Sequence, residues 1–182
     1  KQKIYKMKNK IFIIPGIIFF LIFLIFFYLL TIDRNPTEIP SNLLNKNVPE
    51  FKTSTLIKDK NFVSSVEFGN EVVLVNFFAT WCKPCRDEHI YIKRFSNENG
   101  IRIIGINYKD NPKKAIKWLK KLGNPYSDIP VDKNGRIAID WGVYGIPETF
   151  VVSADRVIKY RHVGPITNKL YKKINKLVKD LQ

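Results

Sequence analysis

Two cysteines, Cys82 and Cys85, are separated by two residues in this 182-residue chain, and few folds place such a pair directly after an apolar run. The run, EVVLVNFFA, is short and almost continuous, which is typical of a strand buried on both faces of a sheet. The segment Lys83 to Asn97 then fits a helix, ended by Asn99 and Gly100. The cysteines therefore stand where a central strand passes into a helix.

Strands and helices alternate in the rest of the chain. IRIIGINY predicts a second buried strand, and NPKKAIKWLKKLG predicts a helix with Pro112 in its first turn and Gly123 after its end. TFVVS and VIKYRHV predict two antiparallel strands, and the last segment has one apolar helical stripe. The order predicts an α/β fold with a mixed sheet and helices on both faces. Cys-x-x-Cys at a strand-to-helix junction in this order is the thioredoxin pattern.

The spacing of the cysteines favours redox chemistry. At the start of a helix, unpaired N–H groups and the helix dipole stabilise a thiolate at Cys82, and Lys83 and Arg86 add positive charge. A thiolate attacks disulfides, and Cys85 can resolve the mixed disulfide. A structural disulfide in so short a loop would constrain little of the unfolded chain, and haem attachment would need His in place of Arg86. A four-cysteine zinc site is impossible. We predict thiol:disulfide exchange without a metal or a cofactor.

A second feature is the stretch IFIIPGIIFFLIFLIFFYLLTI, which holds 22 residues without a charge. As a helix it would be roughly 33 Å long, against a hydrocarbon core of about 30 Å, so it predicts one transmembrane helix. Five lysines precede it, and Arg34 alone follows closely, which predicts a cytoplasmic N-terminus and an exported remainder. A cleaved signal peptide is the alternative, but the run is long for one and no small-x-small site follows it.

The chain thus divides into four predicted parts. Residues 1–10 form a basic cytoplasmic end, 11–32 the transmembrane anchor, 33–47 a tether with three prolines, and 48–182 the folded domain. The formal net charge is +15, and 26 basic face 16 acidic residues after the anchor. Because the lysines are scattered and not interleaved with aromatic residues, we interpret them as a solvated surface and predict no nucleic-acid partner.

Four stretches carry a family resemblance: ATWCKPCRDEH, GINYKD, WLKKLGNPY and GVYGIPETF. Together they resemble the DsbE/CcmG family, the membrane-anchored, thioredoxin-like thiol:disulfide interchange proteins of cytochrome c biogenesis. The resemblance implies a periplasmic domain on a single-pass anchor in the bacterial cytoplasmic membrane. It also implies a reductase that takes electrons from a membrane thiol transporter and passes them to apocytochrome c, directly or through a maturation protein. We expect a monomer.

The resemblance also implies roles for single residues. Cys82 matches the attacking cysteine and Cys85 the resolving cysteine of a redox-active disulfide. Pro147 matches the proline that such folds hold in cis, and the backbone of Ile146 would then pair with an extended peptide. The alternative is that Pro147 only shapes the start of the next strand. The predicted substrate groove consists of Trp81, Lys83, Pro84, Ile146 and Pro147.

Two carboxylates are candidates for taking the proton of Cys85. Thioredoxins carry a buried Asp six residues before the first cysteine, where this chain has Asn76. Glu88 follows Cys85 by three residues, Glu148 follows Pro147, and both match acidic positions of the family. We favour Glu148 as the proton acceptor. The alternatives are that Glu88 is an exposed helix residue and Glu148 a specificity contact.

Other functions stay open beside the dedicated reductase. A copper-handling or metal-delivery module would use both cysteines and a histidine, because copper(I) accepts soft thiolates. A general periplasmic reductase or an oxidase would share the chemistry, and we expect a potential at the reducing end. A peroxidase is a weaker alternative, since Thr80 stands two residues before Cys82 and not three. We interpret His89 as a packing or hydrogen-bonding residue.

Overall fold

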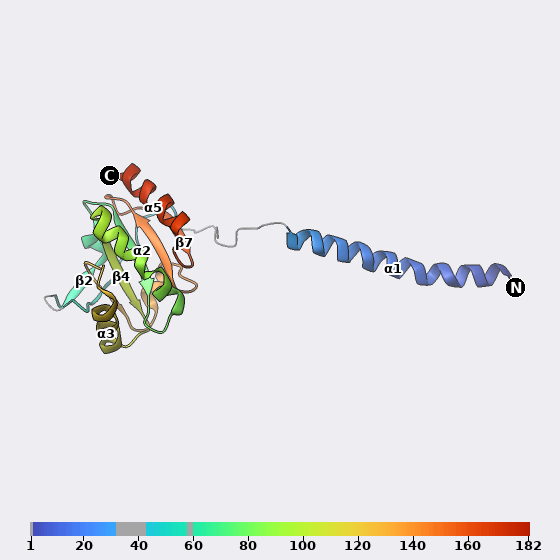
Figure 1. Ribbon diagram of the computed structural model, residues 1–182, viewed down its shortest axis with the longest axis horizontal. Helices are drawn as coiled ribbons and strands as arrows, with labels where there is room; N and C mark the ends of the chain where they lie inside the picture. The colour runs from blue at the N-terminus through green and yellow to red at the C-terminus, as the bar shows by residue number, and fades with distance from the viewer. Residues whose placement is uncertain (1, 32–42, 58–59) are drawn as a thin grey trace. The chain divides into compact units, whose positions relative to one another are not determined.

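The computed structural model describes residues 2–31, 43–57 and 60–182, and the chain forms two compact units. The first unit contains helix α1 (Gln2–Thr31), and the second contains all the other elements (Figure 1). Within α1, Ile13–Thr31 is apolar and long enough to cross a membrane, in agreement with the predicted anchor. Residue 32 of that anchor and residues 33–42 of the predicted tether lie outside the described residues.

The second unit is built on a five-stranded mixed sheet in the order β5-β4-β3-β6-β7. The central strand β3 (Val73–Phe78) is parallel to β4 (Arg102–Tyr108) and antiparallel to β6 (Glu148–Val152). The edge strands are β5 (Val131–Asp132) and β7 (Ile158–Val163). All six residues of β3 are buried, as expected for a strand that is covered on both faces.

In the part of the domain that the structure describes, three helices cover one face of the sheet and one short helix covers the other. Helices α2 (Lys83–Asn99), α3 (Pro112–Leu122) and α5 (Asn168–Leu181) share an apolar core with alternate residues of β3. In Figure 1, α2 lies between the other two. Helix α4 (Arg136–Asp140) packs with the remaining β3 residues on the opposite face. The predicted thioredoxin-like sheet with helices on both faces is confirmed.

The folded domain begins before the predicted boundary at Val48. The N–H of Asn45 donates to the carbonyl of Ile158 at 2.8 Å, and the N–H of Ile158 donates to the carbonyl of Lys46 at 3.0 Å. Residues 43–47, predicted as the end of the tether, therefore belong to the domain. Backbone hydrogen bonds do not depend on a pattern of side chains. Hydrophobic periodicity in the sequence therefore could not predict these two bonds.

Several short elements also lie outside the predicted ones. Strands β1 (Lys52–Ser54) and β2 (Phe62–Ser64) form an antiparallel pair, and a single 3-10 turn, η1 (Ser65–Phe68), follows. The residues just before and at the start of α4 read DKNGR, and Gly135 is the N-cap of the helix. Each of these elements has three to five residues, which is too short for hydrophobic periodicity to identify.

Candidate active site

The start of α2 places the two cysteines, which form a disulfide with Cα atoms 5.3 Å apart. Cys82 is the N-cap residue of α2, and its Sγ accepts the N–H of Cys85 at 3.1 Å. Pro84 stands in the first turn, where its missing N–H would have had no partner in the helix. Cys82 therefore occupies the position at which unpaired N–H groups and the helix dipole favour a thiolate.

The loop before β6 lies against this disulfide. The Sγ of Cys82 is 3.6 Å from the carbonyl oxygen of Ile146, and the Ile146–Pro147 peptide bond is cis, as expected. Among the described residues, the N–H of Ile146 has no hydrogen-bond partner. The backbone of Ile146 thus offers both a donor and an acceptor beside the reactive sulfur, which is what an added peptide strand needs.

The predicted groove residues next to Cys82 are exposed. Trp81 is 60% exposed, although its Nε1–H donates to the carbonyl of Lys109 at 3.2 Å. Lys83 and Pro84 are also exposed, and Lys83 pairs with Asp87 on the next turn of α2. Ile146 is half-buried and Pro147 is buried, so the exposed part of the predicted groove consists of Trp81, Lys83 and Pro84.

Tyr144 is an exposed residue near Pro147 in the sequence that the sequence analysis did not single out. It lies in the loop before Pro147 and is 75% exposed, with the guanidinium of Arg161 5.1 Å from its ring centre. The available signal was an aromatic residue between two glycines, Gly142 and Gly145.

Asp110 holds the segment that leads into the cysteines. Its carboxylate accepts the N–H of Thr80 at 2.7 Å, the hydroxyl of Thr80 at 2.8 Å and the side-chain amide of Asn107 at 3.1 Å. The approach to Cys82 is therefore fixed from the loop that follows β4. No role for Asp110 follows from the motif GINYKD alone, although its position at the carboxyl end of a strand next to β3 was an available signal.

Glu88 is only 1% exposed and lies in a buried chain of hydrogen bonds. Its Oε1 accepts Nδ2–H of Asn76 at 2.8 Å, and its Oε2 accepts the N–H of Ile166 at 2.9 Å. The Asn76 amide also donates to Thr149 and accepts the hydroxyl of Tyr126 at 2.9 Å. Burial raises the pKa of Glu88 to about 7, although both hydrogen bonds to it act in the opposite direction. The alternative of an exposed Glu88 is wrong.

Glu148 lies on the other face of the sheet from Cys85. Residues of a strand alternate between faces, and Val151 packs in the core that contains Cys85, whereas Phe150 packs in the core of α4. Glu148 has the same parity as Phe150, while Thr149 points to Asn76 on the α2 side. We therefore correct our choice of Glu148 as the better proton acceptor for Cys85.

The carboxylate of Glu148 instead holds the loop around Tyr144. Its Oε2 accepts Nε–H of Arg161 at 2.8 Å, and its Oε1 accepts the N–H of Tyr144 at 2.9 Å. Arg161 also donates to the carbonyl of Gly142. Burial raises the pKa of Glu148, and Tyr144 and Arg161 oppose this rise. Both side chains of this ion pair are buried, and their hydrogen bonds to Tyr144 and Gly142 fix the loop to the sheet.

Tyr126 reaches Asn76 because β4 has no side chain at Gly105. Gly105 is paired with Asn76 in the sheet, and a methyl group at this position would lie 2.6 Å from the Tyr126 ring. The ring also stacks on Phe78, with ring centres 4.7 Å apart. The hydroxyl of Tyr126 is thereby fixed next to Asn76.

The described residues contain no group of three or more His, Cys, Asp or Glu side chains placed to hold a metal. His89 is buried on α2, with Nε2 2.9 Å from the carbonyl of Gly123 and its ring centre 4.5 Å from that of Trp118. Its interpretation as a packing and hydrogen-bonding residue is confirmed. The copper-handling alternative, which needs a histidine beside the cysteines, gains no support from this arrangement.

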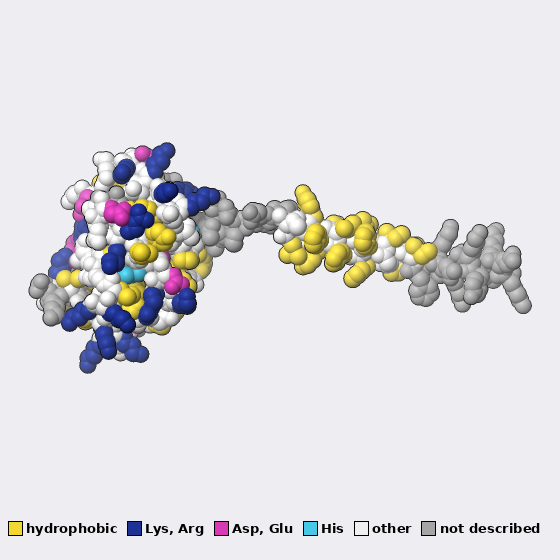
Figure 2. All heavy atoms as spheres, in the orientation of Figure 1, with side chains coloured by type: hydrophobic (Ala, Val, Ile, Leu, Met, Phe, Trp, Pro, Cys, Tyr) yellow, Lys and Arg dark blue, Asp and Glu magenta, His cyan; other side chains and the backbone are white. Residues whose placement is uncertain are grey.

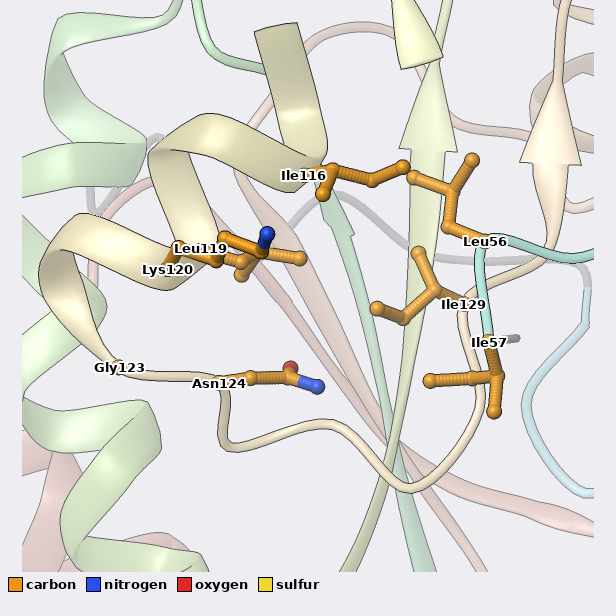
Figure 3. A pocket seen from close by; sticks show the side chains of 8 residues that line it. All are labelled: Leu56, Ile57, Ile116, Leu119, Lys120, Gly123, Asn124 and Ile129. Carbon is orange, nitrogen blue, oxygen red and sulfur yellow. The ribbon is translucent and has the colours of Figure 1, made fainter. Parts of the chain in front are cut away.

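A surface pocket of about 280 Å³ lies beside the second half of α3 and contains none of the predicted site residues. In Figure 3, aliphatic side chains from α3, from the segment after β1 and from the segment before β5 project into it. It is lined by Leu56, Ile57, Ile116, Leu119, Lys120, Gly123, Asn124 and Ile129.

A disulfide at a helix N-cap, set against a cis-proline loop on a mixed five-stranded sheet, defines a thioredoxin-like disulfide oxidoreductase. The Redoxin family model matches residues 43–181. The chain is 41% identical over 169 residues to the thiol:disulfide interchange protein DsbE of Escherichia coli (strain K12), covering 91% of each chain. It is 43% identical over 135 residues to CycY of Rhizobium leguminosarum bv. viciae, covering 74% of this chain and 73% of that protein. The chain belongs to the DsbE family of thiol:disulfide interchange proteins.

Solved structures agree with this fold. A DsbF homologue from Corynebacterium diphtheriae superposes with a TM-score of 0.67 at 20% identity, covering 81% of this chain and 97% of the other. A thioredoxin-family thiol:disulfide interchange protein from Chlorobium tepidum TLS has a TM-score of 0.59 at 27% identity, covering 72% and 94%.

Proposed function

We propose that this chain is a membrane-anchored reductase that delivers electrons to apocytochrome c in the periplasm, directly or through a maturation protein, during cytochrome c biogenesis. The similarity to DsbE over 91% of the chain is the observation that carries this proposal. The apolar segment Ile13–Thr31 supports the anchor, and the five N-terminal lysines support a cytoplasmic N-terminus. A membrane thiol transporter is the proposed electron donor.

The proposed reaction starts from the reduced cysteines. The thiolate of Cys82 attacks one sulfur of the substrate disulfide, which forms a mixed disulfide and releases the second substrate sulfur as a thiolate. The thiolate of Cys85 then attacks Sγ of Cys82, which forms the Cys82–Cys85 disulfide and releases the substrate dithiol. The substrate gains two electrons and the cysteine pair loses two. A dithiol of the donor restores the pair by the reverse exchange.

Glu88 is the proposed acceptor of the Cys85 proton. The two residues are three apart on α2 and both are buried, so their Cβ atoms are helix neighbours at roughly 5 to 6 Å. A carboxylate with a pKa of about 7 suits a base that works near neutral pH. The peptide around the substrate disulfide would bind the free N–H and the carbonyl of Ile146, across the exposed surface of Trp81.

Capture of the mixed disulfide tests this proposal. Cys85→Ser in the native membrane cannot resolve the intermediate, so acid quenching and mass spectrometry identify what is bonded to Cys82. We expect apocytochrome c or a cytochrome maturation protein, and Cys82→Ser is the control that captures nothing. A broad set of unrelated exported proteins would identify a general reductase instead. Tight stoichiometric copper(I) binding that is lost in both single variants would favour metal delivery.

A further inference from the structure

The positive charge of the domain lies almost entirely on one of its faces. From residue 43 onward, the chain has 25 Lys and Arg against 14 Asp and Glu. Helices α2, α3 and α5, which share one core, hold 14 of these basic and four of these acidic residues. The rest of the domain has 11 basic and 10 acidic residues and is nearly neutral. Lysines that are scattered along the sequence are thus gathered on one side by the fold.

The strongest part of this charge is on α3 and α5, which we call the lysine face. All its lysines are exposed, and within the described part of the chain none of them forms an ion pair. Figure 2 shows Lys and Arg side chains at both ends of this side of the domain, over α3 and α5. The lysine face consists of Lys113, Lys114, Lys117, Lys120, Lys121, Lys169, Lys172, Lys173, Lys176 and Lys179.

We propose that the lysine face docks on anionic phospholipid headgroups of the membrane that holds α1, an inference that rests on the proposed anchoring. Lysines near an anionic bilayer are attracted to it individually, and their contributions add along the surface. Residues 32–42, which connect α1 to the domain, span at most about 40 Å even when fully extended. The domain therefore meets the bilayer at a high effective concentration, so weak contacts are sufficient.

Docking on this face would have a direct consequence for exchange. Helix α2 lies in the same layer as α3 and α5, and Cys82 is at its N-terminus. A docked domain would hold the disulfide at the edge of the bilayer contact, next to the membrane surface. A dithiol of a membrane-embedded donor would then be within lateral reach.

Amine labelling of the full chain in vesicles tests this proposal. The protein is reconstituted in phosphatidylcholine alone or with roughly one-third phosphatidylglycerol, and a neutral acetylating reagent is followed at each lysine by mass spectrometry. We expect labelling of the lysine face to slow several-fold in the anionic vesicles. The slowing should disappear near 1 M salt, where the Debye length is about 3 Å. Lys46 and Lys133, exposed outside the three helices, should label equally in both lipids.

A charge variant provides the matched comparison. The first variant changes Lys113, Lys117, Lys172 and Lys176 to Gln, and the remaining lysines of the lysine face should then label at the same rate in both lipids. The control variant changes Lys46 and Lys133 to Gln, and labelling of its lysine face should still be slower in the anionic vesicles. Equal labelling of the wild-type lysine face in both lipids would overturn the proposal. The proposal would also fail if a soluble polyanion slowed this labelling and anionic vesicles did not. Reduction of a soluble peptide disulfide on the same vesicles should not change, so loss of docking and loss of redox function are separate results.

Discussion

A buried carboxylate without a cationic partner is expensive to ionise, and Glu88 has no such partner among the described residues. Its two hydrogen-bond donors are a neutral amide and a backbone N–H. They keep the pKa of Glu88 close to 7 without driving it to the usual low value of an ion-paired acid. This balance is what a proton acceptor for a thiol requires.

Glu88→Gln should slow resolution of the mixed disulfide. General base catalysis typically contributes about 10²-fold or more, so the rate near pH 8 should fall by that order and the inflection near pH 7 should vanish. Rapid-mixing measurements of product release between pH 5 and 9 give this profile. Glu148→Gln is the control that keeps the inflection, and an inflection retained in Glu88→Gln would remove Glu88 from the proposed role.

Glu88 should also make the stability of the oxidised protein depend on pH. The folded state raises its pKa from 4.5 to about 7, so the folded state binds the proton more tightly than the unfolded state. Below pH 4.5, protonated Glu88 therefore makes its full contribution to the free energy of unfolding. This contribution of about 3 kcal/mol is lost as the pH rises from 4.5 through 7. Denaturant unfolding of wild type and Glu88→Gln between pH 4.5 and 8 measures this. A difference between the two proteins that is constant with pH would contradict the assignment.

Asn76→Asp should move the pH profile upward. The change replaces the amide 2.8 Å from Glu88 with a carboxylate, and like charges at this distance raise the pKa of the pair. We expect the inflection of the resolution rate to rise by about one pH unit or more. Thr149→Val removes a neighbour that contacts Asn76 but not Glu88, so it should leave the inflection in place. No upward shift in Asn76→Asp would show that Glu88 does not control the profile.

The sequence could identify both carboxylates but not their faces. All five residues of β6, Glu148 to Val152, are buried. Because polar and apolar residues do not alternate along the strand, the sequence does not show which side chains point toward α2. The cysteines, in contrast, could be placed from the sequence, because the apolar run, Pro84 and the spacing all mark the same helix start.

At the scale of elements, the loop between α4 and β6 is held by an ion pair from β7. Arg161→Met would leave the buried charge of Glu148 without its partner and would remove the donor to Gly142, so unfolding should become easier by about 3 to 5 kcal/mol. Denaturant unfolding measures the loss, and the double variant with Glu148→Gln should lose less than the sum. Arg136→Met is the control, because its pair is exposed and contributes under about 1 kcal/mol. Equal losses in both single variants would contradict this account.

The long elements could be predicted from the sequence and the short ones could not. Helices α2, α3 and α5 have caps and apolar stripes, and β3 and β4 are apolar runs between turn signals. Strand β1 and helix α4 exist because of tertiary contacts. The hydroxyl of Thr53 donates to the carbonyl of Val131, and Asp132 accepts the N–H groups at the start of α4.

At the scale of the whole molecule, the two units should be separable in function. A chain that starts at Leu43 keeps every described contact of the domain, so its exchange with a soluble peptide disulfide should stay within about twofold of the full chain. Capture of membrane partners should fall by about 10²-fold or more, because anchoring supplies the effective concentration. Parallel exchange and capture assays measure both, and unchanged capture would show that the anchor does not recruit these partners.

The absent side chain at Gly105 has a consequence for how such proteins diverge. The ring of Tyr126 occupies the space that any larger residue at 105 would need, and the ring positions Asn76, which in turn positions Glu88. A substitution there must be accompanied by a smaller residue at 126 or by a new partner for Asn76. Positions 105, 126, 76 and 88 should therefore change together in evolution, because the missing side chain at Gly105 affects the protonation of Glu88 through Tyr126 and Asn76.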